Sequence, residues 1–354
     1  MKYAIVDNTS SAGLRALAGE LGRALERDGF TFDEGAQDAD LVLNLVDPQT
    51  ARPYRRKARG TFVAALYECG PDEDGLAVSY PVLVRALANV VLGYDARGSV
   101  WFTTLERGHY EVDADGSGSL AEEVVARLTP LARARLVIDN DFRTDLEPEL
   151  WHGDEITEQI SEAGRRLDEL DLLPSPFPID DLLSERELRH VRRLYGLGGL
   201  SYGNLSARKD EQRFWMSASG VDKSKLELPG RDILLVSGYD AENARMVLSV
   251  PPGVEPRRVS VDAIEHWMIY QRHPDVGAIL HVHAWMEDIA GTQINYPCGT
   301  EELAVAVSEL IDQAPEPANA VVGLRNHGIT ATGSSLPEIL DRIEPRIIRQ
   351  VPMT

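Results

Sequence analysis

The chain has 354 residues, with 36 basic and 57 acidic side chains and a net charge of -21 at pH 7. Such a length is enough for two domains that each bury their own core. The negative charge repels nucleic-acid backbones and anionic lipid surfaces, and no apolar stretch is long enough to cross a bilayer, so we expect neither nucleic acid nor a membrane as a partner.

The first 150 residues predict a small α/β domain with a largely parallel sheet, because short apolar runs alternate with amphipathic segments. The predicted strands are 3–7, 41–46 and 62–66, a predicted hairpin joins 100–104 to 110–112, and the predicted helices are 13–27, 81–92 and 120–135. The loop 8–13 lacks the GxGxxG and Walker patterns, so we interpret it as a helix cap rather than a phosphate loop.

The start of the chain is predicted to be a strand rather than a signal peptide. Only Cys69 and Cys298 are present. We therefore expect a cytoplasmic protein without disulfides or a cysteine-ligated metal.

Residues 151–183 are acidic and contain the proline-rich segment 174–178, which predicts a connector with a helix over 154–170. Residues 184–354 then predict a second domain, in which an antiparallel-rich sheet is flanked by helices. Its predicted strands are 203–208, 214–217, 233–237, 246–250, 278–283, 320–324 and 328–332, and its predicted helices are 184–195, 261–272, 300–311 and 336–343.

Two histidines, His281 and His283, end one of these apolar runs, and Asn326-His327-Gly328 follows some forty residues later. A single histidine beside an apolar strand is usually a hydrogen-bonded core or surface residue. In a strand, however, positions i and i+2 point to the same face, so two imidazoles can bind one ion and His327 can complete a three-histidine site. This ligand set is typical of an open catalytic centre for Zn²⁺ or a similar ion.

Upstream of the histidines lie three further segments, 201–208 (Ser-Tyr-Gly-Asn-Leu-Ser-Ala-Arg), 217–223 (Ser-Ala-Ser-Gly-Val-Asp-Lys) and 262–270 (Asp-Ala-Ile-Glu-His-Trp-Met-Ile-Tyr). In this order and with these spacings, residues 184–345 resemble the class II aldolase/adducin family. The resemblance implies an α/β/α layer fold for the second domain. It also implies metal-dependent chemistry, since the family includes sugar-phosphate aldolases, epimerases, dehydratases and decarboxylases.

The resemblance also assigns roles to residues outside the histidines. Asp262, nineteen residues before His281, matches an acidic residue that ligates the metal and moves a proton, although an aspartate at this position is also typical of a helix N-terminus. The shorter side chain favours epimerase-like geometry over aldolase-like geometry. Glu265 and His266 are expected at the surface or behind the ligands.

The positions that match phosphate-binding residues of the family are Asn204, Ser219, Gly220 and Ser260. Val261 stands where the family often has a second serine, which removes one donor.

The chain departs from the family after His283. Only sixteen residues separate it from Thr300, so the segment that usually carries the proton donor is shortened, and Tyr296 and Glu287 are the nearby substitutes. This combination of kept ligands and altered loop predicts a changed substrate or reaction.

Three classes of function remain open. The first is a metal-dependent lyase that acts through an enediolate on a hydroxy-carbonyl compound such as a sugar phosphate of carbohydrate metabolism. The second is an epimerase, isomerase or decarboxylase on the same scaffold, and the third is a non-catalytic adducin-like binding protein. The adducin branch lacks the metal histidines that this chain has. A homo-oligomer is expected, since relatives are commonly tetramers.

Overall fold

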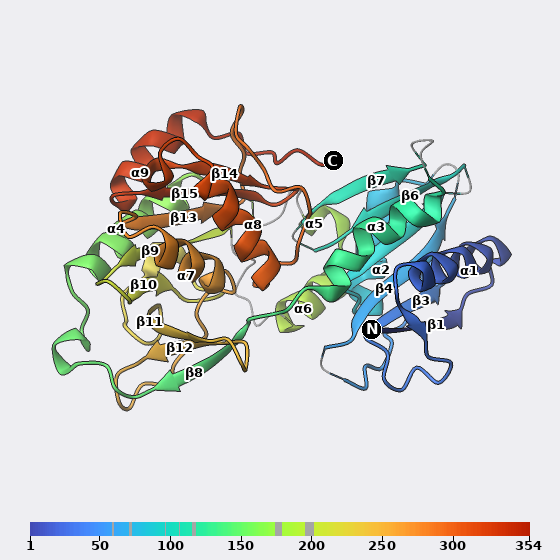
Figure 1. The fold of residues 1–354 in the computed structure, drawn as a ribbon, viewed down its shortest axis with the longest axis horizontal. Coiled ribbons are helices and arrows are strands. Elements are labelled where there is room, and N and C mark those ends of the chain that lie inside the picture. Colours follow the sequence, from blue (N-terminus) through green and yellow to red (C-terminus); the bar gives the residue numbers. More distant parts are fainter. Residues whose placement is uncertain are drawn as a thin grey trace. The chain divides into compact units, whose positions relative to one another are not determined.

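A computed structural model describes residues 1–58, 60–70, 73–95, 97–105, 107–114, 118–173, 179–194 and 202–354. Taken over the described residues, the chain forms two compact units (Figure 1). Unit 1 comprises 1–133, 178–193 and 353–354, and unit 2 comprises 134–177 and 194–352. No helix among the described residues is both long and apolar enough to span a membrane.

Unit 1 is built around a mixed sheet. Its strands follow the order β2-β1-β3-β4-β5-β6-β7, parallel from β2 to β5 and antiparallel from β5 to β7. The strands are β1 (Lys2–Asn8), β2 (Thr31–Phe32), β3 (Leu41–Val46), β4 (Phe62–Cys69), β5 (Val90–Asp95), β6 (Ser99–Thr103) and β7 (His109–Asp113). The helices are α1 (Ala12–Arg27), α2 (Gly75–Ala86), α3 (Leu120–Arg133), α5 (Ile179–Leu182) and α6 (Glu185–Leu194). The expectation of an α/β chain is thus confirmed.

Two local predictions in unit 1 had different outcomes. The helix-cap interpretation is confirmed, because Ser11 Oγ accepts a hydrogen bond from Leu14 N at the start of α1. The helix predicted over 81–92 was wrong in its second half. Leu87 adopts a left-handed conformation with φ 48° that ends α2, and the apolar β-branched run after it pairs with β4 as strand β5.

Unit 2 contains a second sheet in the order β14-β15-β13-β9-β10-β11-β12-β8. All neighbours in it are antiparallel except β12 and β8. Its strands are β8 (Asp139–Arg143), β9 (Gly203–Arg208), β10 (Phe214–Ser217), β11 (Ile233–Asp240), β12 (Arg245–Ser249), β13 (Ala278–Val282), β14 (Val321–Leu324) and β15 (Gly328–Gly333). Its helices are α4 (Glu155–Glu169), α7 (Ala263–Arg272), α8 (Glu301–Asp312) and α9 (Leu336–Ile343). Strand β13, which leads into the predicted metal site, therefore lies inside the sheet.

Helices lie on both faces of this sheet, as two neighbouring residues of β10 demonstrate. The Phe214 ring contacts the rings of Trp267 and Tyr270 on α7, whereas Trp215 donates from Nε1 to Asp154 at the start of α4. Successive side chains of a strand point to opposite faces. Helix α7, packed with α8, therefore covers one face, and α4, packed with α9, covers the other.

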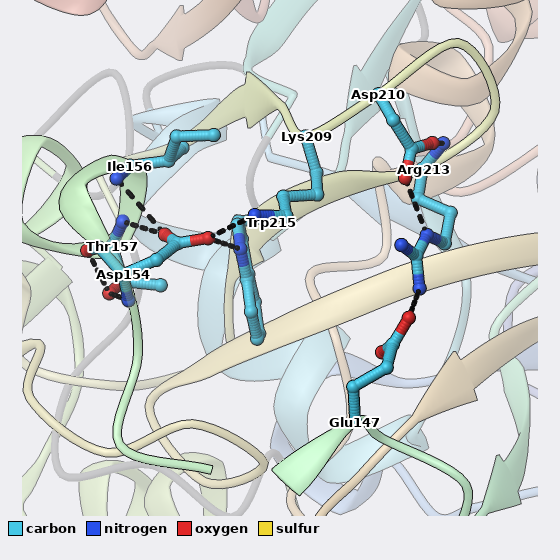
Figure 2. Close-up of polar contacts among 8 residues, drawn as sticks. All are labelled: Glu147, Asp154, Ile156, Thr157, Lys209, Asp210, Arg213 and Trp215. Atoms are coloured by element: carbon cyan, nitrogen blue, oxygen red, sulfur yellow. Dashed lines mark hydrogen bonds and ion pairs between the residues drawn. The ribbon is translucent and has the colours of Figure 1, made fainter. Parts of the chain in front are cut away.

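The start of α4 is fixed by a network of polar contacts (Figure 2). Asp154 Oδ1 accepts hydrogen bonds from the backbone N–H groups of Ile156 and Thr157, and its Oδ2 accepts from Lys209 Nζ at 2.7 Å and Trp215 Nε1 at 3.2 Å. Burial raises the pKa of Asp154, but these donors outweigh burial and lower it overall. A further ion pair network joins Arg213 to Asp210 and Glu147 (Figure 2).

The boundaries of the two units differ from the predicted domains 1–150, 151–183 and 184–354. Strand β8 falls in the predicted first domain but pairs with β12 of unit 2, and α4 of the predicted connector packs on the sheet of unit 2. Strand pairing between distant segments caused this difference, since sequence periodicity carries no record of it. The proline-rich segment 174–178 and the end of the helix predicted over 184–195 lie outside the described residues.

Candidate metal centre

The three predicted ligands converge. His281 lies in β13, His283 follows that strand directly, and His327 lies in the turn between β14 and β15, after Asn326 with φ 59°. The Nε2 atoms of His283 and His327 are 3.0 Å apart, and one ligand atom from each of the three side chains lies within 4.8 Å of the others. All three side chains are buried, with exposed fractions of 1%, 8% and 3%.

Two glycines allow the backbone to approach this closely. A methyl group on Gly203 would stand 2.3 Å from the His281 carbonyl oxygen, and one on Gly328 would stand 2.1 Å from the Val282 carbonyl oxygen. Gly203 also has φ 154°, which larger residues rarely adopt. The absence of side chains at these two positions brings β9 and β15 against both sides of the ligand strand.

The histidines fit a divalent ion. Nitrogens about 2.1 Å from one ion at tetrahedral angles lie about 3.4 Å apart, close to the separation found between His283 and His327. His281 Nδ1 is 3.0 Å from the Ile329 carbonyl oxygen, so it carries the proton, and His281 Nε2 is buried with no hydrogen-bond partner among the described residues. Burial lowers the pKa of His281 to about 4, which keeps this ring neutral and able to bind a cation.

Asp262 lies beside the histidines rather than serving as a helix cap. It precedes α7, yet its side chain makes no capping hydrogen bond. Its Oδ2 instead accepts from Asn204 Nδ2 at 2.7 Å, and the side chain is 6% exposed. Burial raises the pKa of Asp262, while His283 and the Asn204 amide oppose this rise.

Glu265 and His266, which were expected at the surface or behind the ligands, are fully buried one turn further on α7. Glu265 Oε1 accepts a hydrogen bond from Thr330 Oγ1 at 2.6 Å, and His266 Nδ1 is 2.7 Å from Ser206 Oγ. Burial, with a smaller effect of Asp262, raises the pKa of Glu265 to about 8. The signal for Glu265 was present in the sequence, because residues three apart on a helix share a face and Asp262 was already assigned to the site.

The shortened segment after His283 folds back onto its own unit. Trp285 exchanges two backbone hydrogen bonds with Ile348, each 2.8 Å long, and its ring lies where a side chain on Gly323 would be. Glu287 is exposed, and Tyr296 is partly buried. Burial, with a smaller effect of Glu302, raises the pKa of Tyr296. No hydrogen bond joins either substitute to the three histidines within the part of the chain that the structure describes.

Cys298 of this segment contacts one of the three histidines. Its Sγ lies 3.6 Å from His327 Nε2 and 3.8 Å from His327 Nδ1. Because the chain has only two cysteines, no cysteine was expected at the metal site, and this contact was not predicted. Cys298 is distant in the sequence from each histidine of the site, so no local pattern indicated the contact.

The predicted phosphate-binding residues lie in two adjoining turns and in β9. An isolated bridge between Ala218 and Val259 joins the turns, and the backbone N–H groups of Ser219 and Ser260 are already donated to backbone carbonyls. Gly220 has φ 65°, as expected for a tight turn. Any anion bound here would therefore depend on side-chain donors more than on these two backbone groups. Asn204 stands opposite His281 in the register of β9 and β13, with its amide bonded to Asp262.

Comparison with known proteins confirms the resemblance over part of the chain. Residues 188–286 match the family described as Class II Aldolase and Adducin N-terminal domain. Similar curated proteins include methylthioribulose-1-phosphate dehydratase from Leptospira biflexa serovar Patoc (strain Patoc 1 / Ames), 30% identical over 138 residues, which are 38% of this chain and 62% of that protein. The corresponding dehydratase of Pseudomonas aeruginosa (strain LESB58) is 35% identical over 104 residues, which are 29% of this chain and 45% of that protein.

The chain thus spans less than two thirds of the length of these curated relatives. Among solved structures, an L-fuculose 1-phosphate aldolase aligns with 55% of this chain and 83% of its own, at 20% identity and a TM-score of 0.37. The l-fuculose-1-phosphate aldolase of Thermus thermophilus aligns with 53% of this chain and 87% of its own, at 19% identity and a TM-score of 0.34.

Proposed function

We propose that this protein is a metal-dependent lyase that acts on a hydroxy-carbonyl compound, with ketose phosphates as the substrate class. The observation that carries the proposal is the convergence of three buried histidines beside a buried carboxylate, with His281 Nε2 lacking any partner among the described residues. The matched relatives are named as dehydratases of a sugar phosphate, which favours loss of water over carbon–carbon cleavage as the reaction.

The residues have distinct roles in this proposal. His281, His283 and His327 would hold the ion, for which zinc is our proposal because three imidazoles are a common zinc ligand set. A bound dication supplies positive charge that stabilises an enediolate. Asp262, held at Oδ2 by Asn204, removes the proton from the carbon next to the substrate carbonyl with its other oxygen.

The substrate phosphate is proposed to bind at the turns that contain Ser219, Gly220 and Ser260. These residues bring small side chains and hydroxyl groups close together in a chain whose overall charge of -21 repels anions at long range. We propose that local donors, rather than the overall field, capture the phosphate. Tyr296 stays a candidate proton donor.

One observation favours a second candidate, an epimerase on the same scaffold. Asp262 is an aspartate, and the resemblance assigns aspartate at this position to the epimerases. An epimerase would share the ion and the enediolate but return the proton or the carbon fragment to the other face of the substrate. A non-catalytic binding protein needs none of the three histidines, so their convergence argues against that alternative.

Metal analysis of the purified chain tests the ligands. We expect about one zinc ion per chain in the wild type, its loss in His283→Ala, and no loss in His190→Ala, which changes an exposed histidine of α6. An unchanged metal content in His283→Ala would refute the ligand assignment.

Incubation with a panel of ketose phosphates and their unphosphorylated forms, followed by mass spectrometry, tests the reaction. A product lighter by one water indicates dehydration, two fragments indicate cleavage, and an isomer of equal mass indicates epimerisation. Asp262→Asn should keep the metal and lose exchange of the proton next to the carbonyl with D₂O. No turnover of any compound by the metal-loaded wild type would remove the proposed function.

A further inference from the structure

Glu265 is a buried carboxylate that the proposed reaction does not use. It is 1% exposed, its Oε1 accepts a hydrogen bond from Thr330, and its Oε2 has no hydrogen-bond partner among the described residues. Burying a carboxyl group with so few partners is unfavourable, so a compensating role is expected where such a group occurs.

The register of the sheet connects Glu265 with the ligand His281. In the pairing of β13 with its neighbours, Asn204 of β9 and Thr330 of β15 stand directly opposite His281 on either side. Directly opposed side chains share one face of a sheet. That face is covered by the first turn of α7, because Asp262 bonds Asn204 and Glu265 bonds Thr330. Two carboxyl groups of one helix turn thus hold the two side chains that flank His281.

The hydroxyl of Thr330 can link Glu265 to the imidazole. Thr330 Oγ1 has a single proton, which it donates to Glu265 Oε1 at 2.6 Å, and the same oxygen lies 3.4 Å from His281 Nδ1. His281 Nδ1–H therefore has two acceptors, the Ile329 carbonyl at 3.0 Å and the Thr330 hydroxyl at longer range. Both acceptors favour the tautomer that leaves Nε2 available for an ion.

We propose that Glu265 is a positioning residue that acts through Thr330 to fix the orientation and tautomer of His281, and so sets the affinity of the histidine site for its metal. The inference rests on the proposed function. Without Glu265, the Thr330 hydroxyl is free to rotate and to present its proton towards His281, which removes an acceptor and repels Nδ1–H. Groups that orient a metal-binding histidine in this way change metal affinity by about 10- to 100-fold.

Competition of the metal-free full chain with a chromophoric chelator for Zn²⁺ tests the inference. We expect Thr330→Val to weaken zinc binding about 10-fold, and Thr330→Ser, which keeps the hydroxyl, to bind nearly as well as the wild type. Glu265→Leu, which removes the acceptor of the Thr330 proton, should weaken binding, and adding it to Thr330→Val should cause little further loss, because Glu265 acts through Thr330.

Thr332→Val is the matched control. Thr332 is buried on the same strand, but its hydroxyl donates to the Pro317 carbonyl, away from the histidines. Zinc binding should be unchanged in this variant, and the thermal unfolding of each metal-free variant separates loss of fold from loss of affinity. The inference is overturned if folded Thr330→Val binds zinc as tightly as the wild type, or if Thr330→Ser binds as weakly as Thr330→Val. Failure of the wild type itself to bind zinc would instead overturn the proposed function on which the inference rests.

Discussion

Replacing Gly328 by alanine should disrupt the metal centre through a single methyl group. That methyl group would stand 2.1 Å from the Val282 carbonyl oxygen and 3.1 Å from His283 Cα, whereas ordinary contacts begin at 3.4 Å. Both neighbours are backbone atoms that cannot rotate away, so β13 and β15 must separate by roughly 1 Å, at a cost of about 1–3 kcal/mol in the free energy of unfolding. Since metal–ligand distances tolerate only about 0.2 Å, zinc affinity should fall by more than about 100-fold.

Zinc affinity by chelator competition and the unfolding free energy by urea denaturation measure the two effects. Gly291→Ala is the matched control, because a methyl group there would lie 3.5 Å from the Gly323 carbonyl oxygen, which is an ordinary contact. We expect the control to behave as the wild type does. If Gly328→Ala bound zinc and unfolded as the wild type does, close approach of these strands would not be what brings His283 and His327 together.

Two further predictions concern stability. Asp154→Ala removes the cap of α4 and leaves the buried Trp215 Nε1 without its acceptor, so urea denaturation should show an unfolding free energy lower by roughly 2–4 kcal/mol. Asp154→Asn should lose less stability because its side-chain oxygen still caps the helix. Equal losses in the two variants would contradict the importance assigned to the cap. Burial beside Trp101 lowers the pKa of His109 from 6.5 to about 4, so unfolding takes up a proton between these values. The stabilisation from neutral His109 is complete above pH 6.5 and is lost as the pH falls towards 4. The wild type should therefore lose more unfolding free energy than His109→Asn between these pH values. Equal loss in both proteins would refute the lowered pKa assigned to His109.

The segment after His283, which is shorter than its counterpart in the resembled family, is anchored within unit 2. Backbone pairing of Trp285 with Ile348, and the fit of its ring against Gly323, tie the segment to the sheet and to the end of the chain. This anchoring leaves Cys298 in contact with His327. The local hydrophobic pattern predicted neither contact, because both join segments that are distant in the sequence.

Sequence by itself identified the three histidines that converge in the candidate metal centre. Two histidines at i and i+2 of an apolar strand must share a face, and the spacing to Asp262 and His327 matched a known pattern, so these residues could be assigned without coordinates. Most helices and strands of unit 2 followed from the same local periodicity. The second half of the helix predicted over 81–92 was wrong because its apolar residues suit a buried strand equally well, and only pairing with β4 decided between helix and strand.

Only the tertiary structure decided which polar groups support those ligands. Helical spacing places Glu265 on the same side of α7 as Asp262, but its burial against Thr330 depends on where α7 lies across the sheet. The same holds for β8, whose assignment to unit 2 rests on pairing with β12 more than one hundred residues later. Local periodicity fixes which face a side chain occupies, whereas its neighbours across that face depend on how segments far apart in the chain pack together.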